Sequence, residues 1–204
     1  PEYIYLATYL FAALIQILNF TILIFIKIKK PEKVIQKLRP LSEILMQKTL
    51  IIAISAAAVG YSLMSFIMTA TPLQIVNVCK LGDSASATVI QWHVIAMFLP
   101  SFFTGSIISF LGNRKVMLIG ILLYALSIFF SVIGQTIPHF WIALFLCGLG
   151  WNFLYIGGSD IIAKCALPEE RAKVQGVTDF IIFIFVATGS FLAGFLHSSL
   201  GWEI

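Results

Sequence analysis

Six long apolar segments, separated by short polar breaks, run through this sequence of 204 residues. Each is close to or longer than the about 20 residues that a helix needs to cross the hydrocarbon core of a bilayer. Membrane-spanning strands are excluded, because the segments are too long and do not alternate strictly between polar and apolar residues. The pattern therefore predicts an all-α polytopic membrane protein with six transmembrane helices, at residues 3–26, 49–76, 87–111, 116–134, 140–163 and 174–197.

The distribution of basic residues predicts how the chain is threaded through the membrane. Twelve of the 13 Lys and Arg residues fall in the breaks at 27–48, 114–115 and 164–173, whereas Lys80 stands alone in another gap. Loops rich in basic residues stay on the cytoplasmic side. We therefore expect these three breaks to be cytoplasmic and, after an even number of crossings, both ends of the chain to lie outside.

Composition supports a lipid environment. Hydrophobic residues make up 60% of the chain and charged residues 11%, where soluble domains carry about 25% charged residues. The net charge of +4 suits contact with anionic lipid, and no basic stripe interleaved with aromatic residues suggests nucleic-acid binding. Cys79, Cys147 and Cys165 have neither disulfide nor metal-ligand spacing, so we expect no metal and no cofactor.

The first cytoplasmic break, residues 27–48, is the longest and carries seven of the twelve cytoplasmic basic residues. Its apolar residues Val34, Leu38, Leu41 and Leu45 recur at spacings of four, three and four, which suits short amphipathic helices on the membrane surface. A flexible linker fits this stretch equally well. In either case it is the predicted boundary between two membrane domains.

Two loops carry a family resemblance. The segment from Gly105 to Lys115, GSIISFLGNRK, resembles the signature loop of the major facilitator superfamily, Gly-x-x-x-Asp-x-x-Gly-Arg-Arg/Lys. Four positions match that pattern: Gly105, Gly112, Arg114 and Lys115. Ser109 stands in place of the Asp and Asn113 in place of the first Arg, which removes one charge contact. The segment PEERAKVQG at 168–176 resembles the cytoplasmic turn two helices later.

This resemblance implies helices six to eleven of a twelve-helix transporter. Residues 1–26 are then the last helix of the N-terminal half, 27–48 the connector between the halves, and 49–204 the C-terminal half without its last helix. Because the chain opens on Pro1 rather than Met, we expect a fragment whose partner is the N-terminal half of the same protein.

The wording of two interior stretches, MTATPL at 68–73 and QWHVIAMFLPSFFTG at 91–105, is similar to a bacterial subgroup of the superfamily. The similarity implies the bacterial inner membrane as the location. The similarity to this subgroup also suggests flavin uptake as one candidate activity.

Polar and aromatic residues recur on three spans that line the transport cavity in the resembled family. From these spans we predict that five residues border the solute path: Tyr61, His93, Trp151, Asn152 and Tyr155. Such stripes are more often helix-packing surfaces than ligand contacts. His93 has two interpretations of its own, a group that carries protons or binds solute, or a histidine held by a backbone carbonyl.

Asp160 lies near the cytoplasmic end of the fifth span. One interpretation is a helix-end pair with Lys164, at spacing i, i+4, or with Arg114 or Lys115 across the turn. In the resembled family, an acid at this position pairs with a basic residue of the signature loop and holds one conformation, which implies a gating role for Arg114, Lys115 and Asp160.

Asp179 lies further into the sixth span, about 8 Å from its cytoplasmic end at 1.5 Å per residue. It can pair with Arg171 or Lys173 as a charge relay, or line the inner mouth of a cavity.

These observations favour a secondary transporter that moves a small organic solute, with aromatic solutes among the candidates, by alternating access. An intramembrane enzyme would need His, Asp, Glu or Ser clustered at one depth. Because His93 and Asp179 lie toward opposite membrane faces, we expect no enzyme. A non-transporting receptor or channel remains a third interpretation, without a motif in its favour.

Overall fold

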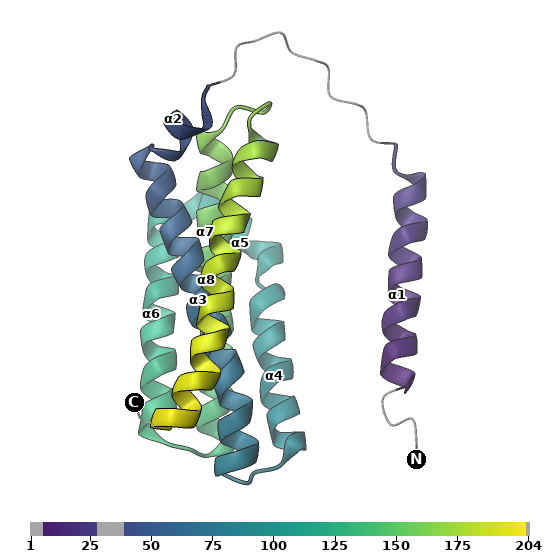
Figure 1. The fold of residues 1–204 in the computed structure, drawn as a ribbon, viewed down its shortest axis with the longest axis vertical. Helices are drawn as coiled ribbons and strands as arrows, with labels where there is room; N and C mark the ends of the chain where they lie inside the picture. The colour runs from purple at the N-terminus through teal and green to yellow at the C-terminus, as the bar shows by residue number, and fades with distance from the viewer. Residues whose placement is uncertain (1–5, 28–38, 203–204) are drawn as a thin grey trace. The chain divides into compact units, whose positions relative to one another are not determined.

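The structure, a computed structural model, describes residues 6–27 and 39–202 (Figure 1). Contacts divide the chain into two units, residues 1–37 and 38–204, which are described separately. In the first unit, α1 (Leu6–Phe25) is a single helix of 20 residues. It has no Gly or Pro to interrupt it and buries none of its side chains within the unit. At 1.5 Å per residue it is about 30 Å long, the thickness of a hydrocarbon core.

The second unit is a bundle of helices (Figure 1). Its elements are α2 (Leu41–Leu45), α3 (Lys48–Leu73) with the π-helical turn η1 (Gln74–Val78), α4 (Asp83–Phe98), α5 (Ser101–Leu111), α6 (Asn113–Ile133), α7 (Ile137–Cys165) and α8 (Arg171–Leu200). Over the described residues, five helices are long and apolar enough to span a membrane, and α4 and α5 together form a sixth span bent by 44°. The prediction of an all-α protein with six apolar spans is confirmed.

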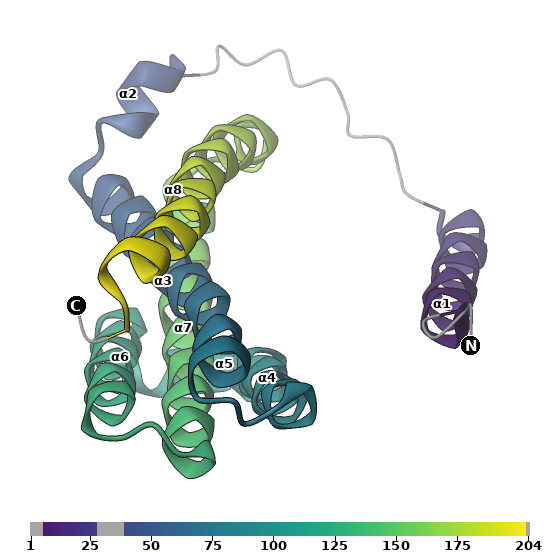
Figure 2. The same cartoon turned by 60° about the horizontal axis from the view of Figure 1, so that its bottom comes forward.

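Helix α7 lies at the centre of the bundle and packs against α3, α4 and α6, while α8 packs mainly against α3 (Figure 2). Four glycines on different sides of α7 allow these close approaches. A β-carbon on Gly148 would lie 2.6 Å from the carbonyl oxygen of His93 in α4, and one on Gly158 would lie 3.0 Å from that of Ala53 in α3. On the side of α6, Gly150 lies against the carbonyl oxygen of Gly120, and Gly157 lies against the side chain of Met117. Packing of this kind, through small residues, is how helices associate inside lipid.

The outward side of the bundle is apolar. Phe102 and Phe110 of α5 are 82% and 89% exposed, and other large apolar side chains, aliphatic and aromatic, cover the outer faces of α3, α6 and α8. An apolar surface of this extent is unfavourable in water and favourable in hydrocarbon. The bundle is therefore built to sit in a membrane.

Part of the long basic break folds onto the bundle. Its short helix α2 buries Ile44, which packs with Leu50 of α3, Ile162 of α7 and Val174 of α8. Residues 39–48 are thus attached to one end of the bundle, whereas residues 28–38, which hold the rest of the expected amphipathic helices or linker, lie outside the described residues. The division into 1–26, 27–48 and 49–204 stays a prediction.

Candidate functional site

Three of the five residues predicted to border the solute path form one aromatic cluster. The ring of Tyr61 in α3 meets Trp151 and Tyr155 of α7 edge to face, with centroid separations of 5.3 and 5.4 Å. Trp151 and Tyr155, one turn apart, are stacked with their centroids 5.0 Å apart. Phe98 of α4 and Phe183 of α8 extend the cluster, at 5.8 Å from Trp151 and 5.9 Å from Tyr61.

The cluster reaches from the core of the bundle to its surface. Trp151 is buried, Tyr61 and Tyr155 are half-buried, and Phe98 and Phe183 are exposed. The indole Nε1 of Trp151 is buried without a hydrogen-bond acceptor among the described residues. Indole N–H is a donor only, and leaving a buried donor unpaired costs about 1–3 kcal/mol. The cluster therefore combines an aromatic wall with one unused donor.

Two apolar hollows lie elsewhere on the bundle. One of about 370 Å³ is formed by α3, α6 and α8 and includes Phe66, Ile128 and His197. Another of about 490 Å³ follows the contact of α3 with α8. Neither is lined by Tyr61 or Trp151, and their walls carry few polar groups, so the aromatic cluster is the better candidate for specific binding.

His93 is fully buried between α4 and α7. Its Nδ1 lies 2.7 Å from the carbonyl oxygen of Leu144, and because a carbonyl only accepts, Nδ1 carries the hydrogen and donates. The other ring nitrogen, Nε2, is buried without a partner in the described part of the chain. The hydrogen bond to Leu144 is the backbone contact expected if His93 has a structural role. It leaves Nε2 of the ring free to accept a hydrogen bond. A role in the solute path stays a prediction.

Asn152 is fully buried, and its amide is engaged by α4 and α5. Its Nδ2 donates to the carbonyl of Met97 at 2.6 Å and to Oγ of Ser101 at 2.7 Å. Its Oδ1 accepts from Oγ1 of Thr104 at 2.6 Å. The three groups lie on both sides of the break between α4 and α5. Sequence analysis named Asn152 as a candidate for the solute path but gave no sign of this network.

The signature loop joins α5 to α6 through Gly112, whose φ of 81° lies in the left-handed region that favours glycine. Beside Gly105 the space is open, because a β-carbon there would meet no atom within 4 Å. Asn113, which begins α6, donates through Nδ2 to Oδ2 of Asp160 at 2.6 Å. The residue that replaces the family's Arg therefore still links the loop to α7.

Asp160 pairs within its own helix in this structure, and the gating role of Arg114, Lys115 and Asp160 stays a prediction. Oδ2 of Asp160 lies 2.5 Å from Nζ of Lys164, one turn later in α7. Of the pairs considered from the sequence, the structure contains the one with Lys164 and not the ones with Arg114 or Lys115. Both members are partly exposed, so the pair contributes little to stability. Similarly, Asp179 accepts from Nε2 of Gln175 within α8 at 2.7 Å rather than pairing with Arg171.

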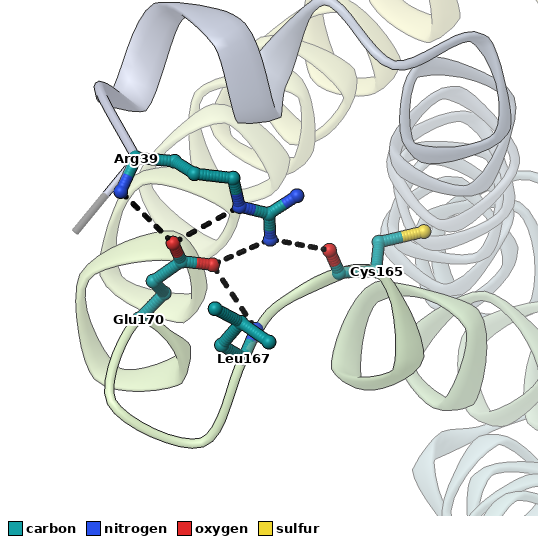
Figure 3. Close-up of polar contacts among 4 residues, drawn as sticks. All are labelled: Arg39, Cys165, Leu167 and Glu170. Carbon is teal, nitrogen blue, oxygen red and sulfur yellow. Dashed lines mark hydrogen bonds and ion pairs between the residues drawn. The ribbon is translucent and has the colours of Figure 1, made fainter. Parts of the chain in front are cut away.

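Sequence analysis missed the ion pair of Arg39 with Glu170 (Figure 3). Nη2 of Arg39 lies 2.6 Å from Oε2 of Glu170, its Nε donates to Oε1 at 3.1 Å, and its backbone N–H donates to Oε1 at 3.2 Å. Nη2 also donates to the carbonyl of Cys165, and the N–H of Leu167 donates to Oε2 of Glu170. The contact joins the segment before α2 to the turn between α7 and α8.

The electrostatics of this pair follow from its geometry. The carboxylate of Glu170 is almost entirely covered, with its side chain 3% exposed, while that of Arg39 is 34% exposed. The hydrogen bonds from Arg39 lower the pKa of Glu170 to about 2. A bidentate contact between an Arg and a carboxylate fixes the relative orientation of the two groups and also pairs their charges. The only sequence signals were an Arg in the basic break and a Glu in the second family-like loop.

Comparison with known proteins agrees with this architecture. A sequence model of the major facilitator superfamily matches residues 50–204. The chain is 40% identical to the riboflavin transporter RfnT of Brucella anthropi, in an alignment that covers 100% of the chain and 52% of the Brucella protein. It is 36% identical to the uncharacterized MFS-type transporter YdeG of Bacillus subtilis, over 74% of the chain and 35% of that protein.

A more distant relative is the multidrug resistance protein MdtL of Shewanella oneidensis, which is 27% identical over 64% of the chain and 35% of its own length. The chain thus spans about half of the Brucella protein or about a third of the other two. No solved structure gives a significant match.

Proposed function

Because this chain belongs to the major facilitator superfamily, we propose that it forms most of the C-terminal half of a secondary transporter for a planar aromatic solute. It works with an N-terminal bundle of the same protein. The two bundles rock against each other, so that a site between them opens to one side of the membrane at a time. The observation that carries the proposal is the aromatic cluster of Tyr61, Trp151 and Tyr155, which holds a buried and unpaired donor.

The chemistry of the cluster favours a flat ring system with a hydrogen-bond acceptor at its edge. Each well-placed aromatic contact contributes about 0.5–1.5 kcal/mol beyond the burial of area. The N–H of Trp151 gives direction, since a carbonyl or ring nitrogen of the solute would remove the cost of the unpaired donor. Phe98 and Phe183, which flank the cluster, are exposed, so the cluster extends to the bundle surface on their side.

Riboflavin is the first candidate solute. It is a planar ring system with carbonyl and ring-nitrogen acceptors, and a relative that is 40% identical to the whole of this chain is named as a riboflavin transporter. The relatives named as multidrug resistance proteins are less similar, at 25–27% identity for MdtL and the two Bacillus proteins. Uptake of a flavin is therefore favoured over efflux of unrelated drugs.

The proposed orientation places the basic helix ends in the cytoplasm of a bacterium. Lys48 at the start of α3, Arg114 and Lys115 at the start of α6, and Arg171 and Lys173 at the start of α8 mark ends of the bundle that the charge rule assigns to the inside. Bacterial relatives support the plasma membrane as the location.

The test is uptake of radiolabelled riboflavin by bacteria that cannot make it and that express the full-length transporter. Trp151→Phe keeps an aromatic ring but removes the N–H, so the apparent KM should rise about five- to tenfold, the value of one hydrogen bond. Trp151→Ala should raise it further. Phe129→Ala is the control, because Phe129 lies on the outer face of α6 and is 56% exposed.

All rates are divided by the amount of protein in the membrane. An unchanged KM in both Trp151 variants would exclude the aromatic cluster as the binding site. The transport function itself would be refuted if the purified protein, reconstituted in liposomes, transported neither a flavin nor any other aromatic solute.

A further inference from the structure

The span formed by α4 and α5 is broken at its middle and bent by 44°. Pro100, which lies between the two helices, has no N–H and ends the regular hydrogen-bond pattern of α4. In an unbroken helix the carbonyl of Met97 would accept from the N–H of Ser101. At this bend it accepts instead from Nδ2 of Asn152, which reaches across from α7.

One amide therefore holds both arms of the bend. Asn152 binds α4 through the carbonyl of Met97, and it binds α5 through the hydroxyls of Ser101 and Thr104. The hydroxyl oxygen of Thr104 lies 2.6 Å from Oδ1 of Asn152 and 2.8 Å from the carbonyl of Pro100. Because a hydroxyl has a single hydrogen, Thr104 can shift it between these two acceptors. Of the contacts with α5, the one through Thr104 is thus easily exchanged.

Helix α5 is held more loosely than its neighbours. Of its 11 residues only Thr104 and Ile108 are buried, while Phe102 and Phe110 point outward and are almost fully exposed. Segments with few buried contacts move at low cost. Within this span, α5 is the arm that can swing, and Thr104, one of its two buried residues, is bound to Asn152.

We propose that Asn152 is the positioning residue of a hinge between α4 and α5, and that it controls the conformational step of transport without contacting the solute. The hinge is coupled to the aromatic cluster, since Phe98 is the last residue of α4 and its ring lies against Trp151, the neighbour of Asn152. This assigns Asn152 a role different from the solute contact expected from the sequence. The part of the inference that concerns transport rests on the proposed function.

The hinge itself is tested without any solute. Spin labels at Thr88 of α4 and Ser109 of α5, both exposed, report the angle between the helices in the purified full-length transporter. Ser109 is eight residues beyond Ser101, or about 12 Å along the helix, so a change in angle is readable as a change in distance. Asn152→Leu, which removes all three hydrogen bonds, should shift or broaden the distance distribution. Thr104→Val, which removes the contact with Oδ1 of Asn152 and leaves those with Met97 and Ser101, should have a smaller effect.

The matched control is Ser127→Ala, which also removes a buried hydrogen bond between helices, from Ser127 in α6 to the carbonyl of Ala143 in α7, but lies away from the bend. Its distance distribution should match that of the unsubstituted protein. A distribution for Asn152→Leu that matches the control would overturn the hinge, whatever the protein transports.

Uptake measurements then separate positioning from binding. Loss of the Asn152 contacts at the hinge should lower the maximal rate of Asn152→Leu roughly tenfold, a change of about 1.4 kcal/mol in the barrier, and leave KM close to that of the unsubstituted protein. Trp151→Phe should show the opposite pattern. A raised KM with an unchanged maximal rate in Asn152→Leu would identify Asn152 as a solute ligand instead. If neither riboflavin nor another aromatic solute is transported, the proposed function fails while the spin-label result still decides the hinge.

Discussion

Replacing Gly148 with alanine should force α4 and α7 apart at their closest approach. The added β-carbon would lie 2.6 Å from the carbonyl oxygen of His93, 3.0 Å from the β-carbon of Ala96 and 3.2 Å from the backbone nitrogen of Met97. Ordinary contacts begin at 3.4 Å, so the carbonyl would have to retreat by 0.8 Å. Two of the three atoms belong to the backbone, and no change of side-chain rotamer relieves the overlap. Helix α4 must therefore move as a whole.

The expected magnitude follows from two opposing terms. Overpacking of this kind costs typically about 1–3 kcal/mol, and a rigid backbone carbonyl places Gly148 toward the upper end. Alanine regains about 1 kcal/mol over glycine through its helix propensity. The net destabilisation is about 2 kcal/mol, which corresponds to a fall in Tm of about 4–8 °C when the bundle unfolds as a unit of 150–250 residues.

Thermal unfolding of the purified protein in detergent measures this shift. Gly176→Ala is the control, because a β-carbon at Gly176 in α8 meets no atom within 4 Å, so only the gain in helix propensity remains and Tm should stay level or rise. A Tm for Gly148→Ala as high as that of Gly176→Ala would refute the argument, since it would mean that α4 and α7 are not in contact through their backbones at this point.

Two further predictions concern the ends of the bundle. Glu170→Gln should weaken the contact with Arg39 and release α2. A cysteine introduced at the buried position Ile44 should then react several-fold faster with a thiol reagent, which is about the effect of losing one charged hydrogen bond. An equal rate with and without Glu170→Gln would show that the ion pair does not hold α2. Since the folded-state pKa of Glu170 is about 2 and its ordinary value about 4.3, this stabilisation is complete above the ordinary value and is lost as pH falls through about 2. For the topology, Ser42→Cys and Ser84→Cys in an otherwise cysteine-free transporter should react from opposite sides of the membrane, Ser84→Cys from outside, and reaction from the same side would reject the threading.

The spans could be predicted because a bilayer imposes a simple requirement. A chain in hydrocarbon must satisfy its backbone hydrogen bonds within each segment, so apolar length alone indicates a helix. The observed helices agree with the predicted spans to within a few residues at most ends, and α7 extends only slightly beyond the predicted 140–163. The turn at Gly112 was also foreseeable, because the signature pattern places a glycine where the backbone has a positive φ.

The side-chain partners could not be predicted in the same way. In a soluble helix the apolar stripe reveals which face turns inward, but spans in lipid are apolar on all sides, so the sequence leaves the rotation of each helix open. Helical spacing placed Trp151 and Tyr155 one turn apart; only the packing of α3 against α7 brought Tyr61 to them.

By itself, the sequence of this protein determined which segments are helices, the family-like turns between them and the apolar character of every span, since these depend on neighbouring residues. The tertiary structure decided that Asn152 binds the bend of α4 and α5, that Asp160 pairs with Lys164 rather than Arg114, and that Arg39 reaches Glu170. The two longer-range contacts join residues 55 and 131 positions apart. Their formation depends on how closely and at what rotation the helices pack, and small residues such as Gly148 set that approach only once the bundle is assembled.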